Sequence, residues 1–584
     1  MEKTDMLKRT KEIWCKLRGR FVDEHGLKWD WDYTSEGKAA IKSLMSRDVS
    51  VVEVPREIEG IPVAKVGQAF WGTGPIKIII PDTVVWLHYC FNECSSVQEI
   101  VLPDTITDLG VGCFGGCVNL TKVRLPSGLT HIAGGAFYGC TMLETISLPE
   151  GIQSIGDEAF EGCTSLVSVN LPESVQLIGE NAFSECANLR TINFPKSLRI
   201  IGNRGFSKCH SLSGKLDLTH VEKVGYWAFE ACDSLTSVTL PTHNDVIRSG
   251  AFGKCASLKH VSFNGKETKL VSSMFEGCES LCIDVLPDSI TEIENDCFKG
   301  CKSLNLFVVP KSLRTIASHA FEGCDGLCSL QLDNGKLETI GAASFADCTK
   351  LNKVKLPATL KSVGVEAFHG CANLEELLLN DGVIEIGKGA FSFCGKLGSV
   401  VLPKTLKEIL PGMFSYCRSL RSVRLSDEVI SIGERVFFEC TSLESIVFPE
   451  ALKKICRSAF GRTGLKIINL RGMEELGEYA FEGCSALEEV VIGENLTTLP
   501  SGCFVHCASL KRLFVPDNVT VIGYDVVSEG TELLINKPES VRYLEKKNIP
   551  VRDRIDDYYE PTPTLESELG EDGASDFWLN TTQW

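Results

Sequence analysis

Cysteine is the reactive residue type that recurs most often in this sequence. The chain has 26 cysteines, and Cys-x-x-x-Cys pairs such as Cys90/Cys94 and Cys297/Cys301 resemble the ligand pairs of a metal site. In each pair the second cysteine ends a Phe-x-x-Cys motif, and the first stands directly before the Phe of that motif. The spacing is therefore a by-product of a repeat, and we predict no metal site from it.

The recurrence of the motif also argues against disulfides. Repeats stacked in register point successive thiols in the same direction, with Cβ atoms about 4.8 Å apart. A disulfide needs converging vectors and a Cβ separation of about 3.5–4.5 Å. We therefore expect free, buried thiols that act as small hydrophobic residues, with Cys282 and Cys328 on the strand surface. Free thiols fit a reducing compartment or an anaerobic habitat.

Two glycine-rich stretches match nucleotide-binding motifs in their letters alone. Gly110-x-Gly112-x-x-Gly115 is not followed by the βαβ unit that a dinucleotide site requires. The stretch 382–388 ends in Gly-Lys, but Gly389 stands where a phosphate loop has Ser or Thr. The histidines are scattered without metal-ligand spacing. We predict a non-enzymatic protein without catalytic residues, cofactor or metal; an enzyme or effector with an unrecognised site, assembled at a cap, is the alternative.

The Phe-x-x-Cys motif gives the chain its period. It recurs at 23-residue steps from Cys94 to Cys324 and then continues, while Thr73, Thr463 and Gly530 occupy the Cys position in three degenerate units. These units define 21 coils. A fixed period of this length is the sequence signature of a solenoid. The motif cysteines are Cys94, Cys117, Cys140, Cys163, Cys186, Cys209, Cys232, Cys255, Cys278, Cys301, Cys324, Cys348, Cys371, Cys394, Cys417, Cys440, Cys484 and Cys507.

One unit, residues 140–163, shows how each coil should fold. Residues 143–148 read Leu-x-x-Ile-x-Leu, a strand whose alternate residues point inward, and Pro149 ends it. Ala159 and Phe160 should begin a short helical turn on the other side. Since one unit cannot bury its own apolar face, the units must stack. At about 4.8 Å per strand, the stack should form a rod or arc on the order of 100 Å long with a large concave surface.

The units resemble the BspA-type leucine-rich repeats, whose pattern Leu-x-x-Ile-Gly-x-x-Ala-Phe-x-Gly-Cys-x-x-Leu-x-x-Val-x-Leu-Pro is matched almost throughout by Ile155 to Pro172. The resemblance covers roughly residues 28–550. It implies a right-handed leucine-rich repeat coil of about 21 units of 23 residues, with parallel β-strands on one face and short helical turns and loops on the other. It also implies an adhesive or host-interacting surface protein of a microbe.

Four regions follow from the sequence. Residues 1–26 have helical apolar spacing and should form an amphipathic helix on the first coil, or else bind a partner. Residues 27–66 should be a β-rich N-terminal cap, and residues 67–551 the solenoid with its C-terminal cap. Residues 552–584 should be a disordered acidic tail. Its stretch Asp576 to Leu579 is a docking motif or simply solvated chain.

Charge and hydropathy restrict the classes of partner that the protein is expected to bind. The formal net charge is −18, so nucleic acid is disfavoured as a partner. No apolar stretch approaches the length of a membrane-spanning helix, so we expect no membrane insertion. The N-terminus lacks a signal peptide, which favours a cytoplasmic protein and counts against the adhesin role; the alternative is cell-surface location by non-classical export. The oligomeric state stays open.

The outward strand positions form a column where a protein ligand should bind. The column is polar in the first half of the chain and rich in apolar residues in the second. An exposed apolar stripe on the concave face favours protein binding, whereas covering loops or plain β-propensity would also produce it. We predict protein binding, as a surface adhesin or as an intracellular scaffold. The candidate binding residues are Arg124, Val308, Lys355, Leu378, Val401, Arg424 and Phe514.

Overall fold

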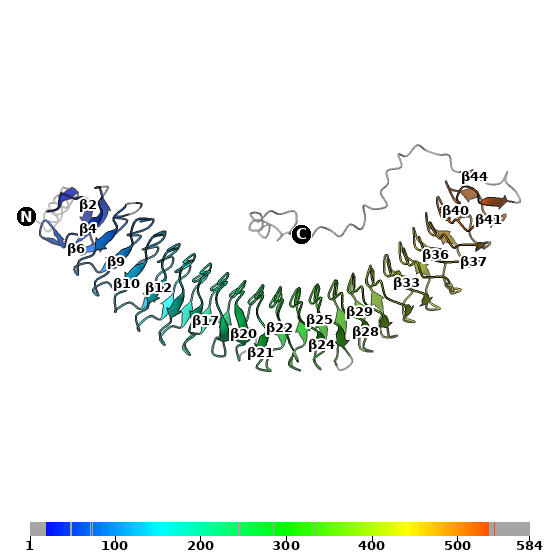
Figure 1. Ribbon diagram of the computed structural model, residues 1–584, viewed down its shortest axis with the longest axis horizontal. Helices are drawn as coiled ribbons and strands as arrows, with labels where there is room; N and C mark the ends of the chain where they lie inside the picture. Colours follow the sequence, from blue (N-terminus) through cyan, green and yellow to red (C-terminus); the bar gives the residue numbers. More distant parts are fainter. Residues whose placement is uncertain are drawn as a thin grey trace, which may run out of the picture.

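The computed structural model describes residues 19–535 and 542–543, except 47–48, 71, 73, 243–245, 284 and 333–334. The predicted acidic tail lies outside the described residues, as does most of the predicted N-terminal helix. The described chain forms a long arc of stacked coils (Figure 1). This confirms the predicted solenoid of about 21 coils with parallel strands.

Most coils contribute strands to two ladders that run along the arc. The first strand ladder follows the motif cysteine and matches the predicted strand. Thr145, Ile146 and Ser147 of β12 are exposed, buried and exposed, and Ile146 lies beside Val169 of β14. The strands of the first ladder are β4 (Val51–Glu53), β7 (Lys77–Ile79), β9 (Glu99–Val101), β10 (Lys122–Arg124), β12 (Thr145–Ser147), β14 (Ser168–Asn170), β16 (Thr191–Ile192), β18 (Gly214–Asp217), β20 (Leu235–Thr239), β21 (His260–Ser262), β24 (Leu306–Val308), β26 (Ser329–Gln331), β28 (Lys353–Lys355), β30 (Glu376–Leu378), β32 (Ser399–Val401), β34 (Ser422–Arg424), β37 (Ile467–Leu470), β39 (Glu489–Ile492), β41 (Arg512–Val515) and β43 (Glu532–Ile535).

The second strand ladder consists of strands that precede the Phe of the Phe-x-x-Cys motif, which we call the repeat Phe. This ladder was not predicted. Its strands are mostly two residues long, and Ile155 of β13 lies beside Ile132 of β11. The strands of the second ladder are β6 (Ile61–Val66), β8 (Trp86–Leu87), β11 (His131–Ile132), β13 (Ser154–Ile155), β15 (Leu177–Ile178), β17 (Ile200–Ile201), β19 (Lys223–Val224), β22 (Lys269–Leu270), β23 (Glu292–Ile293), β25 (Thr315–Ile316), β27 (Thr339–Ile340), β29 (Ser362–Val363), β31 (Glu385–Ile386), β33 (Glu408–Ile409), β35 (Ser431–Ile432), β36 (Lys454–Ile455), β38 (Glu475–Leu476), β40 (Thr498–Leu499), β42 (Val521–Ile522) and β44 (Arg542–Tyr543).

The segments around the repeat Phe are tight turns rather than the predicted helical turns. No helix occurs among the described residues. The residues two before and two after the repeat Phe are left-handed, as at Glu158 (φ 57°) and Gly162 (φ 70°) around Phe160. An α-helix cannot contain such residues. Instead the turns bond to the next coil, and the backbone N–H of Phe137 donates to the carbonyl of Ala159 at 2.8 Å. We call the surface formed by these turns the turn surface.

The core is a continuous stack of repeat phenylalanines. Twenty Phe rings, from Phe70 to Phe504, lie face to face, and Phe160 is centred 5.2 Å from Phe137 and 5.1 Å from Phe183. Offset stacking at this spacing is favourable for aromatic rings. The period of the sequence therefore becomes a single hydrophobic column that runs through the molecule.

The N-terminal cap closes the first coil with a small sheet. β1 (Gly19–Val22) pairs antiparallel with β2 (Lys28–Tyr33), which pairs with β3 (Ala39–Leu44), and β5 (Glu57–Ile58) pairs with β6. The buried Trp29 meets Phe70 edge to face at 5.9 Å, which covers the end of the Phe stack. Residues 19–22 are therefore strand, not the end of a helix over 1–26, because their backbone pairs with β2.

Candidate protein-binding surfaces

The outward column of the first ladder carries the predicted binding residues, and the structure places only four of them on successive coils. Lys355 lies beside Leu378, and Val401 lies beside Arg424, on neighbouring strands. Arg124 lies on β10, about 50 Å away along the arc at about 4.8 Å per coil. The column therefore does not act as one compact site.

Apolar side chains are exposed in the second half of this column, as predicted. Leu378 is 44% exposed, Val401 59% and Phe514 53%, and Phe514 lies beside Leu534 on β43. Val308 is only half-buried, within β24. Ile467, which is not among the predicted residues, is exposed on β37 in the other outward column of the same ladder. Its signal was an apolar residue at a strand position that most other coils fill with a polar or charged residue.

The first ladder does not line the inner edge of the arc. In Figure 1, β24 and β28 lie nearer the outer edge than β25 and β29 of the second ladder. The predicted concave placement of the binding column is therefore wrong. The physical reason is that the turns are hydrogen-bonded from coil to coil, as between Gly135 N and Asp157 O at 2.8 Å, so they stack as closely as strands do.

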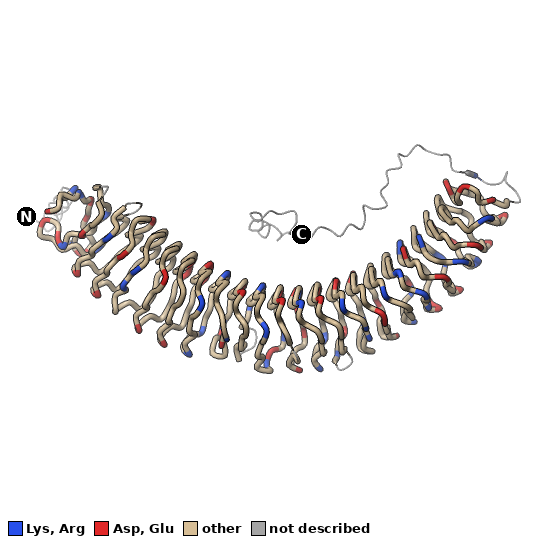
Figure 2. Tube along the Cα trace, in the orientation of Figure 1, with Lys and Arg blue, Asp and Glu red and all other residues tan. Residues whose placement is uncertain are grey.

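Charged residues of both signs are intermixed along the arc (Figure 2). Many of them pair across neighbouring coils, as Lys208 does with Glu185 at 2.8 Å. The guanidinium group of Arg124 similarly lies 3.1 Å from the carboxylate of Asp104. Hydrogen bonds from Ser127, and then the charge of Arg124, lower the pKa of Asp104. Exposed pairs of this kind contribute little to stability.

The turn surface carries an aromatic cluster that the sequence analysis did not find. The rings of Phe393 and Tyr416 stack at 4.4 Å, and Tyr416 meets Phe438 edge to face at 5.6 Å. The guanidinium groups of Arg435 and Arg462 lie 4.8 and 5.5 Å from the Phe438 ring centre. Phe393 and Tyr416 stand two residues after the repeat Phe, where many coils have Gly.

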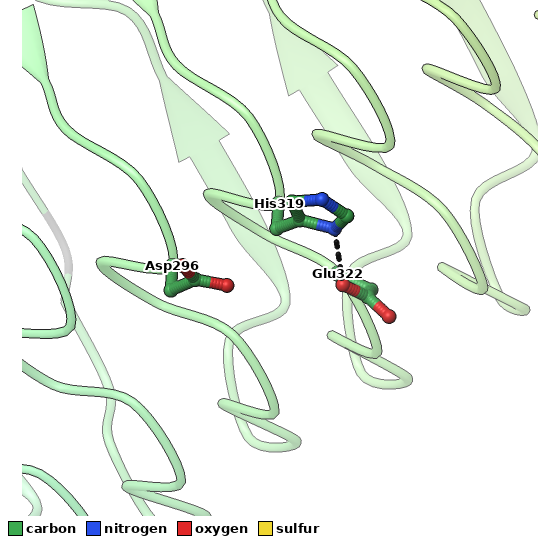
Figure 3. Close-up of side chains that lie close together, drawn as sticks. All are labelled: Asp296, His319 and Glu322. Carbon is green, nitrogen blue, oxygen red and sulfur yellow. Dashed lines mark hydrogen bonds and ion pairs between the residues drawn. The ribbon is translucent and has the colours of Figure 1, made fainter. Parts of the chain in front are cut away.

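One group of side chains has the composition of a metal site. Asp296, His319 and Glu322 lie together on two neighbouring turns, with possible ligand atoms within 4.8 Å of one another (Figure 3). His319 Nδ1 is already hydrogen-bonded to Glu322 Oε2 at 2.7 Å. The ammonium group of Lys299 lies 3.2 Å from Glu322 and 3.9 Å from Asp296. One ammonium group thus already pairs with both carboxylates, and the group is a surface ion network.

The described cysteines behave as the repeat predicts. All of them are free, the motif cysteines are buried, and Cys282 and Cys328 are exposed. Cys90 and Cys297 fill the buried position before the repeat Phe. Burial raises the pKa of Cys163 to about 12, which keeps it a neutral thiol. A neutral, enclosed thiol is neither a nucleophile nor a metal ligand.

The glycine motifs lie in turns of the repeat, and Gly110 (φ 66°) and Gly112 (φ 61°) have left-handed backbones. Among the described residues, no helix is long and apolar enough to cross a membrane.

Stacked coils of this pattern, with Leu-x-x-Val-x-Leu strands and a buried Phe-x-x-Cys column, define a leucine-rich repeat solenoid. The family model described as BspA type leucine rich repeat region (6 copies) matches residues 86–213, 213–328, 291–421 and 407–533. The chain therefore belongs to the BspA-type leucine-rich repeat family, which confirms the predicted resemblance.

Solved structures include similar bacterial proteins. A leucine-rich repeat protein from Bacteroides ovatus is 21% identical, with a TM-score of 0.41, and the match covers 88% of this chain and 99% of that one. A leucine rich cell surface protein from Faecalibacterium prausnitzii is 26% identical, with a TM-score of 0.35, and the match covers 54% of this chain and 94% of that one. No curated protein matches the chain.

Proposed function

We propose that the chain is a non-enzymatic solenoid that binds a protein through the first-ladder surface between β28 and β41. The observation that carries this proposal is the row of exposed apolar side chains at Leu378, Val401 and Phe514 on a hydrogen-bonded scaffold. Exposed apolar patches on rigid surfaces mark protein interaction sites.

Basic residues flank the part of the apolar row that Leu378 and Val401 form. Lys355 lies at one end of the pair Lys355–Leu378, and Arg424 follows Val401 on the next strand. These four residues occupy successive coils and span about 15 Å at about 4.8 Å per coil. A protein partner that places an apolar residue between acidic ones would complement this stretch, since Arg and apolar anchors dominate interface energetics.

The cellular compartment of the protein distinguishes two forms of the proposal, an intracellular scaffold and a surface adhesin. We propose an intracellular scaffold, and the free thiols of Cys282 and Cys328 on the surface support it because such thiols persist in a reducing compartment. The alternative is adhesion or host interaction at a microbial surface after non-classical export. Staining of intact and permeabilised native cells with an antibody to residues 552–584 separates them: staining of intact cells contradicts the scaffold form.

Arg424 and Arg124 offer a matched test of the binding surface. Both are exposed arginines in the same outward column, but only Arg424 adjoins the apolar row. A photo-reactive residue at Leu378 should cross-link a discrete partner in extract of native cells. We expect Arg424→Ala and Phe514→Ala to reduce this cross-linking and Arg124→Ala to leave it unchanged. Cross-linking that both Arg424→Ala and Phe514→Ala retain contradicts the proposal.

A further inference from the structure

A hollow interrupts the turn surface near the N-terminal end of the solenoid. Its volume is about 490 Å³, and residues of four successive coils line it, from Tyr89 to Glu161. Its floor is glycine, including Gly112, Gly115 and Gly135. The absence of a side chain at Gly135 keeps part of this recess open.

The backbone does not require glycine on this floor. Gly135 stands two residues before its repeat Phe, a position that is left-handed in other coils as well. Those coils still place side chains there, such as Glu158 (φ 57°), Trp227 (φ 56°) and Tyr479 (φ 56°). A Cβ added at Gly135 would have no neighbouring atom closer than 3.8 Å. What Gly135 contributes is open space.

Two tyrosines form walls of the hollow. The ring of Tyr89 covers Gly112, because a Cβ on that glycine would lie 2.6 Å from Cε1 of Tyr89. Tyr138 lines the hollow and is about half exposed. Aromatic faces beside an open recess favour a flat or cationic group.

Carboxylates form the other end of the hollow. Asp157, Glu158 and Glu161 line it, and no Lys, Arg or His is among the lining residues. Within the part of the chain that the structure describes, Glu158 and Glu161 form no ion pair. Glu185, in the next coil, pairs with Lys208. The carboxylates of Glu158 and Glu161 therefore remain available to a cation.

The surroundings of Glu161 show the same excess of negative charge. Burial, then the charges of Glu158 and Glu185, raise the pKa of Glu161, while Lys208 and Arg204 on later coils oppose the shift more weakly. A bound cation would relieve this repulsion.

We propose that this hollow binds the guanidinium group of an arginine side chain presented by a partner protein. The planar cation would stack on a tyrosine ring and donate hydrogen bonds to the carboxylates. Phosphate is disfavoured by the same carboxylates, so the Gly110-x-Gly112-x-x-Gly115 motif serves a cation rather than a dinucleotide. The site lies on the turn surface, apart from the first-ladder surface.

The probe for this site is N-acetyl-arginine amide, with the uncharged N-acetyl-citrulline amide as its isosteric control. Saturation-transfer difference NMR on the full chain reports contact at the side-chain CH₂ groups. We expect transfer to the arginine compound and at least about threefold less to the citrulline compound. Gly135→Tyr should abolish transfer by placing a side chain in the hollow.

Charge variants keep the test valid if Gly135→Tyr does not fold. Glu158→Gln with Glu161→Gln preserves side-chain volume and should reduce transfer by about threefold or more. Glu366→Gln is the matched control, since Glu366 occupies the position of Glu158 in a coil outside the hollow. Equal transfer to both compounds, or transfer that survives the double variant, overturns the proposal. Because the probe is a small molecule, neither result depends on partner binding at the first ladder.

Discussion

The thiol of Cys163 donates a hydrogen bond to the backbone carbonyl of Phe137, with 3.2 Å between Sγ and O. Phe137 belongs to the preceding coil, so each such bond joins two coils. The same bond links Cys140 to Phe114 and Cys186 to Phe160. The motif cysteine is therefore both a small core residue and a hydrogen-bond donor between coils.

Enclosure of the motif thiols predicts selective labelling. In the native protein, maleimide should modify Cys282 and Cys328 rapidly and the half-exposed Cys456 more slowly, because thiols react only when accessible. The motif cysteines should react only after unfolding in urea. Peptide mass spectrometry identifies the modified sites, with the urea-unfolded chain as control. Labelling of Cys163 as fast as Cys328 would contradict the structure.

Stability should fall at alkaline pH. Burial raises the pKa of motif thiols such as Cys163, so the folded chain keeps the proton that the unfolded chain loses near pH 8.5. The free energy of unfolding is thus independent of these thiols below about pH 8 and declines above it, by about 1.4 kcal/mol per pH unit for each fully protected thiol. The urea midpoint, measured between pH 7 and 9.5, should decrease. A constant midpoint would show that the thiols ionise while folded.

Truncation of a side chain within the Phe stack should lower the free energy of unfolding. Phe160 is fully buried between two rings, so Phe160→Ala should reduce the free energy of unfolding by about 3–5 kcal/mol, and Phe160→Leu by less. Urea unfolding monitored by circular dichroism measures the loss. Phe514→Ala is the control, since its side chain is exposed and should change stability by about 1 kcal/mol or less. Similar losses for both would refute the stacked core.

Close approach of neighbouring coils predicts a glycine requirement before the turn. A Cβ on Gly156 would lie 2.6 Å from the backbone N of Gly134, so the backbone of one of the two coils must shift. Gly156→Ala should therefore destabilise the chain by about 1–3 kcal/mol. Gly398→Ala is the matched control, because its Cβ would meet no atom within 4 Å. Thermal unfolding of the two variants compares them directly; a tolerated Gly156→Ala would contradict this packing.

The strand pattern and the core were predictable from sequence, whereas the binding surfaces were predictable only in part. Ile146 and its counterparts were identified by alternation, which depends on local geometry alone. Arg124 and Arg424 occupy the same repeat position, and each lies beside an exposed valine, Val101 and Val401 respectively. Only Arg424 lies in the stretch that also carries Leu378. The hollow beside Gly135 was not predicted, because its glycines occupy positions that are typical of turns in this repeat.

The sequence by itself determined the period, the family, the buried Phe-x-x-Cys column and the free thiols, because each coil contacts chiefly its neighbours and repeats their pattern. The tertiary structure alone decided the conformation of the turns, the place of the first ladder on the arc and the recess lined by Tyr89 and Glu161. Hydrogen bonds between coils hold residues such as Glu158 in a left-handed backbone that its residue type does not favour. The shape of the arc, in turn, is the sum of small rotations between coils, which no single repeat encodes.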